Sequence, residues 1–132
     1  MSSPELDALI AAIRENLTDD LLTVEQREMT RPTNSAGHCY VASETLWHMT
    51  GCAMLSYQLK HEGNSHWFLM DTLGEVFDIT ADQFETTPPY GDARRTSFYP
   101  ADRPSNRAAI LIRRLRAKGV RDAEAAAHPT LF

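Results

Sequence analysis

The chain has 132 residues, of which 42% are hydrophobic and 23% charged, and a formal charge of −5. This composition is typical of a globular domain large enough to bury a core without disulfides or structural metals. No apolar run approaches the roughly 20 residues of a transmembrane helix. The first five residues also lack the basic region of a signal peptide, so we expect one cytoplasmic domain over residues 1–132.

Charge is unevenly distributed along the chain. Residues 1–92 carry 15 acidic and 4 basic side chains, whereas residues 93–132 carry 3 acidic and 9 basic ones. A basic segment of this kind is found in nucleic-acid-binding proteins, but a basic helix packed on an acidic body accounts for it equally well. Nucleic acid is therefore the less favoured partner.

The N-terminal part is predicted to be helical. Ser3 is a typical N-cap residue, and apolar side chains recur at helical spacing over residues 4–17. A second, short helix is predicted up to Glu28, which assigns N-terminal helices to residues 1–29. The composition of residues 30–37 predicts a loop.

A buried helix and a small sheet are expected next. Residues 39–49 carry apolar side chains at helical spacing, and residues 53–60 have the composition of a strand. Residues 65–71 and 75–80 are predicted to form a hairpin around the loop 72–74. This order of elements indicates an α+β protein.

The register of that hairpin decides which side chains meet. If Thr72 is the centre of a three-residue loop, residues whose numbers sum to 144 face each other. His66 then lies directly opposite Asp78, with Cβ atoms about 5 Å apart on one face of the sheet. A slip of one residue would place the two side chains on opposite faces. The sequence thus permits the pair without requiring it.

The C-terminal third is predicted to contain one helix. The proline-rich residues 86–104 are expected to be loop, with a short strand near residues 98–99. Ser105 is expected to cap a helix over residues 105–118, which Gly119 ends. Residues 119–132 form a tail in this interpretation.

Three side chains in chain order indicate a thiol hydrolase: Cys39 at a helix start, His66 on a strand, and Asp78 on the next strand. A helix N-terminus and a nearby imidazolium both favour the nucleophilic thiolate, and a carboxylate fixes the imidazole tautomer. Taken singly, the cysteine is more often a buried small hydrophobe, the histidine a hydrogen-bonded residue and the aspartate a turn residue. Together, their order and spacing favour catalysis.

Four further residues are weaker candidates for oxyanion or substrate contacts. The backbone amide of Cys39 needs a second donor, and Asn34 is the best side chain for that role. His38, beside the thiol, is a candidate for substrate binding. Tyr40 and Trp67 are candidates for the substrate wall, with core packing as the alternative.

No metal or cofactor site is predicted. The potential zinc ligands do not have the CxxC or HExxH spacing of a zinc site; they are Cys39, Cys52 and the histidines at 38, 48, 61 and 66. If residues 39–49 are helical, the two cysteines lie about 20 Å apart, too far for a disulfide. Free thiols are therefore expected.

Several segments resemble the YunG-like family of small bacterial and phage proteins. The similar segments are residues 32–39, 65–67, 74–84 and 99–115, so the resemblance covers roughly residues 30–118. More distantly, a histidine followed by Asp-x-Thr on the next strand is similar to the transglutaminase-like core.

The resemblance implies a papain-like (transglutaminase/NlpC-like) single domain in which the cysteine helix packs on a small antiparallel sheet. It places Cys39, His66 and Asp78 in the positions of a catalytic triad. At His38 the chain departs from the family, which commonly has glutamine there. The resemblance does not imply a substrate.

Together these features predict a cysteine hydrolase or acyltransferase of the peptidase, amidase or deamidase type, with no cofactor. Its partner would be a protein, a peptide or a small amide. The alternative is a non-catalytic phage or bacterial binding or inhibitor protein that keeps the fold. Thiol reactivity against pH distinguishes the two, because an unactivated thiol reacts with an ordinary pKa of about 8.5.

Overall fold

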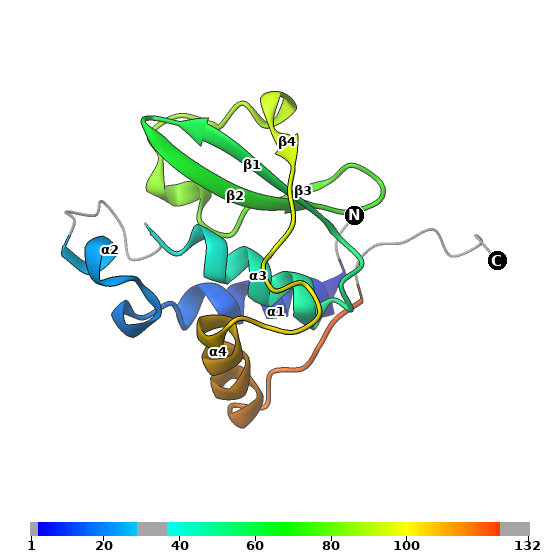
Figure 1. Ribbon diagram of the computed structural model, residues 1–132. Coiled ribbons are helices and arrows are strands. Elements are labelled where there is room, and N and C mark those ends of the chain that lie inside the picture. Colours follow the sequence, from blue (N-terminus) through cyan, green and yellow to red (C-terminus); the bar gives the residue numbers. More distant parts are fainter. Residues whose placement is uncertain (1–2, 29–36, 125–132) are drawn as a thin grey trace.

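A computed structural model describes residues 3–28 and 37–124 and has an α+β architecture (Figure 1). Helices come first, a four-stranded antiparallel sheet follows, and a further helix closes the described part. The α+β prediction is therefore confirmed.

Helix α1 spans Pro4–Glu15. The Ser3 hydroxyl accepts a hydrogen bond from the Leu6 amide at 3.1 Å, as an N-cap serine should. The helix ends two residues before the predicted position 17, because the amide of Asn16 bonds to the Ile13 carbonyl in a tight last turn.

Two short turns of helix replace the single second helix that was predicted. A 3-10 turn covers Asp19–Leu21, and α2 covers Val24–Glu28. Thr23 and Gln26 form a capping box between them: each side-chain oxygen accepts a hydrogen bond from the other residue's backbone amide. This local cap explains why the chain starts a new helix at residue 24.

Helix α3 spans Cys39–Met49, as predicted. It begins with the Ala42 amide bonded to the His38 carbonyl at 2.9 Å. It ends at Gly51, which has φ +73, a left-handed conformation that favours glycine. Nearly every residue from 41 to 49 is buried, so α3 is the central helix.

The sheet has four strands: β1 (Leu55–His61), β2 (Asn64–Met70), β3 (Val76–Phe77) and β4 (Arg94–Arg95). Their spatial order is β3-β2-β1-β4, with every neighbouring pair antiparallel. The two central strands are long, and the two edge strands have only two residues each. The expected long hairpin partner of β2 at residues 75–80 is therefore much shorter than predicted.

Two strand predictions were wrong in position. The strand predicted to begin at residue 53 begins at Leu55, because Cys52, at φ +59, still belongs to the turn that follows α3. No strand forms at residues 98–99; instead β4 pairs at Arg94 and Arg95 with β1. Phe98 is only 2% exposed, so its apolar side chain lies in the core and not on a sheet edge.

The register of β2 and β3 differs from the prediction by two residues. Leu69 pairs with Phe77, which makes Leu73, and not Thr72, the centre of the three-residue loop. The carboxylate of Asp71 holds this loop by accepting the amides of Leu73 and Glu75, both at 2.9 Å. A shift of two residues preserves the face on which each side chain lies.

Helix α4 spans Asn106–Ala117 and confirms the predicted C-terminal helix. Ser105 is its N-cap, and its hydroxyl accepts the Ala108 amide. Beyond α4 the chain returns to α3, because the Ala123 amide bonds to the Met49 carbonyl at 3.0 Å. Residues 121–124 form no helix, and the rest of the predicted tail lies outside the described residues.

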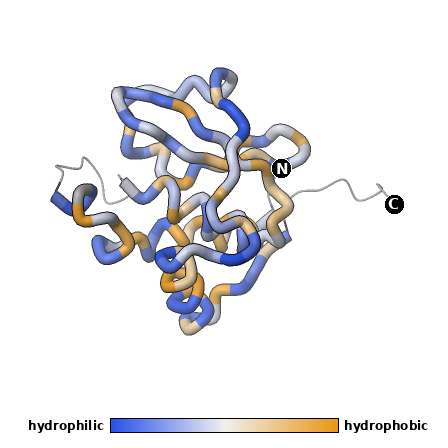
Figure 2. Tube along the Cα trace, in the orientation of Figure 1, coloured by the Kyte–Doolittle hydropathy of each residue, from blue (hydrophilic) through white to orange (hydrophobic). Residues whose placement is uncertain are grey.

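Helix α3 lies between the sheet and the helices α1 and α4 (Figure 1). In Figure 2 hydrophobic and hydrophilic segments alternate along α1 and α4, as in amphipathic helices. The core between these elements contains fully buried Leu6, Ile13, Leu46, Met49, Leu69, Leu111 and Leu115. None of the helices in the described ranges is both long and apolar enough to cross a membrane.

The two faces of the sheet are covered by different parts of the chain. Trp67 and Leu69 lie on the face toward α3, where the Ser43 hydroxyl donates to the Trp67 carbonyl at 3.1 Å. His66 and Phe68 lie on the opposite face, since side chains alternate along a strand. The segment after β3 covers that face: Phe84 packs edge-on against the ring of His66, 4.8 Å between centroids.

Candidate active site

Cys39 is the first residue of α3, and its side chain is half-buried at the start of β2. Its Sγ atom lies 3.9 Å from the carbonyl oxygen of Ser65. The thiol also interacts electrostatically with the ring of His66, which raises the pKa of that ring. The structure therefore brings together two residues that are 27 positions apart in the sequence.

His66 and Asp78 form a buried pair. Nε2 of His66 lies 2.7 Å from Oδ2 of Asp78, and the two side chains are 0% and 3% exposed. The predicted contact therefore exists despite the register difference, although Asp78 directly follows β3 and is not part of the strand. The Tyr90 hydroxyl donates to the same Oδ2 at 2.8 Å.

The carboxylate of Asp78 is held by these two donors alone among the described residues. Its other oxygen, Oδ1, is buried and has no hydrogen-bond partner in this part of the chain. Burial of the Tyr90 phenol raises its pKa, and the hydrogen bond to Asp78 and the charge of that carboxylate raise it further. Tyr90 is therefore a neutral hydrogen-bond donor over the whole physiological pH range.

The pKa of His66 is raised from 6.5 to about 9. Burial of the ring lowers it, but the hydrogen bond to Asp78, the interaction with Cys39 and the charge of the Asp78 carboxylate outweigh the burial. The protonated ring is thus the favoured form at neutral pH.

Gln83 is a site residue that the sequence did not single out. Its amide nitrogen lies 3.3 Å from Nδ1 of His66 and 3.0 Å from the hydroxyl of Thr80. With the amide rotated by half a turn, its oxygen would accept from both groups, so Gln83 fits either protonation state of the ring. The sequence feature that could have identified Gln83 is its position in the segment 78–84, which carries part of the family resemblance.

Helix α1 fixes the segment that supplies these side chains. The guanidinium of Arg14 donates to the Ile79 carbonyl at 3.2 Å and forms an ion pair with Asp82 at 2.7 Å. Both partners lie between Asp78 and Gln83 in the sequence. Arg14 therefore connects the N-terminal helix to the two groups that contact the His66 ring.

Two of the weaker candidates are placed as follows. Asn34 lies outside the described residues. His38 is fully buried, and its Nε2 lies 2.8 Å from the Thr18 carbonyl oxygen. The ring of His38 is thus committed to the contact between the start of α3 and the turn after α1. Its proposed contact with a substrate stays a prediction.

Tyr40 and Trp67 belong to an aromatic cluster beside the site. Their ring centroids are 4.7 Å apart, and both rings pack on Phe98, at 5.4 and 5.3 Å. Both side chains are half-buried, so they pack against the core and also reach its surface. This position is compatible with core packing and with a substrate wall.

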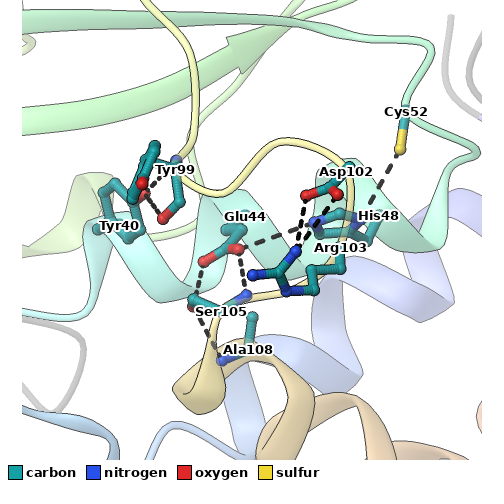
Figure 3. Close-up of polar contacts among 9 residues, drawn as sticks. All are labelled: Tyr40, Glu44, His48, Cys52, Tyr99, Asp102, Arg103, Ser105 and Ala108. Atoms are coloured by element: carbon teal, nitrogen blue, oxygen red, sulfur yellow. Dashed lines mark hydrogen bonds and ion pairs between the residues drawn. The ribbon is translucent and has the colours of Figure 1, made fainter.

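The second cysteine has a different environment (Figure 3). Cys52 is exposed after the C-terminal end of α3, with Sγ 3.7 Å from Nδ1 of His48. Nε2 of the same ring lies 3.7 Å from the buried carboxylate of Glu44. Partial burial of the Cys52 thiol raises its pKa, which disfavours the thiolate. Both cysteines are free, as expected.

No group of three or more metal-ligating side chains occurs within residues 3–28 and 37–124. Two arginines of α4 form ion pairs within the chain: Arg114 with Asp20 at 2.5 Å, and Arg116 with Asp122 at 3.1 Å. The prediction that nucleic acid is the less favoured partner remains untested.

The fold and site define an α+β domain in which a helix-start cysteine meets a buried histidine–carboxylate pair. A profile of the YunG protein family matches residues 5–119, so the chain belongs to this family. The match includes α1, which the sequence resemblance over residues 30–118 had left out. Comparisons with curated proteins and with solved structures found no match.

Proposed function

We propose that the protein is a cysteine hydrolase or acyltransferase that acts on an amide bond. The supporting observation is the buried His66–Asp78 contact at 2.7 Å, with the thiol of Cys39 beside the preceding residue, 3.9 Å from the Ser65 carbonyl oxygen. A thiol, an imidazole and a carboxylate in this chain of contacts are the groups that acyl transfer through a thioester requires.

Each group has one step in the proposed reaction. In the reactive form the thiol proton of Cys39 is on Nδ1 of His66, and the sulfur attacks the carbonyl carbon. The imidazolium then protonates the leaving amine, and the C–N bond breaks to leave a thioester on Cys39. His66 next removes a proton from water, or from an acceptor amine, which attacks the thioester and releases the thiol.

Asp78 is assigned to orientation of the ring. Because Nε2 faces the carboxylate, Nδ1 is the nitrogen left for the thiol. Tyr90 holds the carboxylate in place through the same Oδ2, and Gln83 contacts Nδ1 from the side. These contacts limit rotation of the imidazole during proton transfer.

The oxyanion would be stabilised by backbone amides at the start of α3. The first amides of a helix have no intrahelical acceptor, and those of Cys39 and Tyr40 lie in this first turn. Donors fixed in this way are suited to the charge that develops on the carbonyl oxygen. Asn34 stays a proposed second donor.

The arrangement also supports a papain-like fold as the finer classification. Its characteristic parts are a cysteine at the start of a central helix and a histidine on a strand of an antiparallel sheet against that helix. The carboxylate of Asp78 directly follows the next strand in chain order. Within this class the substrate would be a protein, a peptide or a small amide.

The rate of Cys39 alkylation by iodoacetamide between pH 4 and 9 tests the proposal. We expect a rate at Cys39 that persists well below pH 7 and that collapses in His66→Gln, because the variant lacks the imidazolium. Mass spectrometry of digested protein resolves the two cysteines, so Cys52 serves as a control thiol in the same chain. An alkylation rate at Cys39 that rises only near pH 8.5, with no effect of His66→Gln, would contradict the proposal.

A further inference from the structure

A hollow of about 390 Å³ adjoins the start of α3. Gly37 and Tyr40 line it from the chain around Cys39, Tyr99 lines it from the loop before α4, and Arg107 lines it from the first turn of α4. Gly37 and Tyr40 are two residues before and one residue after Cys39 in the sequence, so the hollow lies near the start of the helix that carries the thiol.

Most polar groups in the wall of this hollow already have partners. The Tyr40 hydroxyl accepts the Tyr99 amide at 2.9 Å and lies 3.3 Å from the Tyr99 carbonyl. Ser105 donates its amide and its hydroxyl to the buried carboxylate of Glu44, at 2.7 and 2.6 Å (Figure 3). Because these groups already have hydrogen-bond partners, they shape the hollow, and other residues must supply the contacts to a ligand.

Arg107 is the residue of this wall whose positive charge is not balanced by an ion pair with a described residue. Its side chain is exposed and forms no ion pair with any residue of the ranges 3–28 and 37–124. The later arginines of α4 differ, since Arg114 and Arg116 are paired with Asp20 and Asp122. A guanidinium is well suited to a carboxylate, which it binds through two parallel hydrogen bonds.

Tyr99 adds an apolar surface next to this charge. Its side chain is 88% exposed, although its backbone is fixed by both hydrogen bonds to Tyr40. An exposed aromatic ring on a fixed backbone loses little conformational entropy when it packs against a ligand. The hollow thus combines a cation and an aromatic surface, and it lies near the start of the helix that carries Cys39.

We propose that this hollow binds a carboxylate of the substrate, so that the enzyme acts on amides or peptides with an acidic group close to the scissile bond. The inference rests on the function proposed above. Arg107 would bind the carboxylate, and Tyr99 would cover the carbon chain between the carboxylate and the reacting carbonyl.

A series of thiol reagents tests this preference without a known substrate. The probes are N-iodoacetyl derivatives of glycine, 4-aminobutyrate and 6-aminohexanoate, each with its neutral carboxamide counterpart. The measured quantity is the ratio of the carboxylate rate to the carboxamide rate at Cys39. We expect a ratio of about five or more at one chain length, because a charge-assisted contact forms only when the carboxylate reaches Arg107.

Two variants of α4 provide the control. Arg107→Gln should reduce the ratio to about one, whereas Arg107→Lys should keep part of it because the charge remains. Arg113→Gln removes the same charge from an exposed position of the same helix and should leave the ratio unchanged. The ratio compares two probes on one protein sample, so it is insensitive to a loss of folded protein.

The outcomes separate this inference from the proposed function. A ratio near one at every chain length in the wild type, or an equal ratio in Arg107→Gln, overturns the carboxylate preference. If His66-dependent reactivity toward iodoacetamide persists in that case, the proposed function stands without it. If Cys39 reacts no faster than Cys52 and independently of His66, both proposals fail.

Discussion

Replacing Asp78 with asparagine tests the electrostatic arrangement around His66. The asparagine oxygen can still accept the hydrogen bond from Nε2, so the ring keeps its orientation while the negative charge is lost. The pKa of His66, about 9 against an ordinary 6.5, corresponds to roughly 3 kcal/mol of preference for the protonated ring. In Asp78→Asn we expect this pKa to fall toward 6.5, because burial then opposes protonation with less compensation.

Nuclear magnetic resonance of the histidine ring protons measures this pKa directly, with His66→Gln to assign the signal. The preference for the protonated ring also affects the free energy of unfolding. Because the pKa of His66 is raised in the folded state, its contribution is fully present below about pH 6.5 and is lost as the pH rises through about 9. Urea unfolding at about pH 6 and about pH 10 should thus differ more in the wild type than in Asp78→Asn, by up to roughly 3 kcal/mol.

The reasoning would be refuted by a wild-type ring that titrates at or below 6.5. It would also be refuted if Asp78→Asn left both the titration and the pH dependence of unfolding unchanged. The first result would mean that burial outweighs the contacts with Asp78 and Cys39. The second would mean that the carboxylate does not act on the ring.

Three further outcomes are expected. Tyr90→Phe removes one of the two donors to Asp78 and should lower the free energy of unfolding in urea by about 1 kcal/mol; no change would argue against this bond. Glu44→Gln weakens the buried acceptor of both Ser105 groups and should cost about 2 kcal/mol in thermal unfolding, whereas an unchanged melting temperature would contradict the role given to this contact. Because partial burial raises the pKa of Cys52, its alkylation at pH 7 should be slower than that of free cysteine, and a faster rate would disprove this.

The helices could be predicted because their signals are local. Ser3 and Ser105 cap α1 and α4 as expected, and Gly51 ends α3 with the left-handed backbone that glycine allows. The sheet was harder to predict, since pairing depends on residues far apart in the sequence. β4 at Arg94 and Arg95 has no apolar alternation that could have marked it as a strand.

The contact between His66 and Asp78 could be predicted only in part. The predicted register placed Thr72 at the centre of the loop, whereas the carboxylate of Asp71 fixes Leu73 there. The predicted register differs from the observed one by two residues, and a shift of two residues keeps each side chain on the same face of the sheet. The prediction of the contact was therefore correct although the predicted register was not. An error of one residue would have lost it.

The contacts of Gln83 and Tyr90 could not be predicted from the sequence, and the reason is a different one. Both reach the site because the chain after β3 folds back over the sheet face that carries His66. No periodicity in a loop predicts such a path. From this path the hydroxyl of Tyr90 donates to the Asp78 carboxylate.

Acetylation by p-nitrophenyl acetate tests the central claim most directly, because it reports formation of an acyl group on the thiol. The account predicts a rapid burst of p-nitrophenolate and an acetyl group on Cys39, detected by mass spectrometry. Both should be lost in His66→Gln and kept in Cys52→Ser. Acetylation of Cys39 no faster than that of Cys52, and independent of His66, would contradict the account.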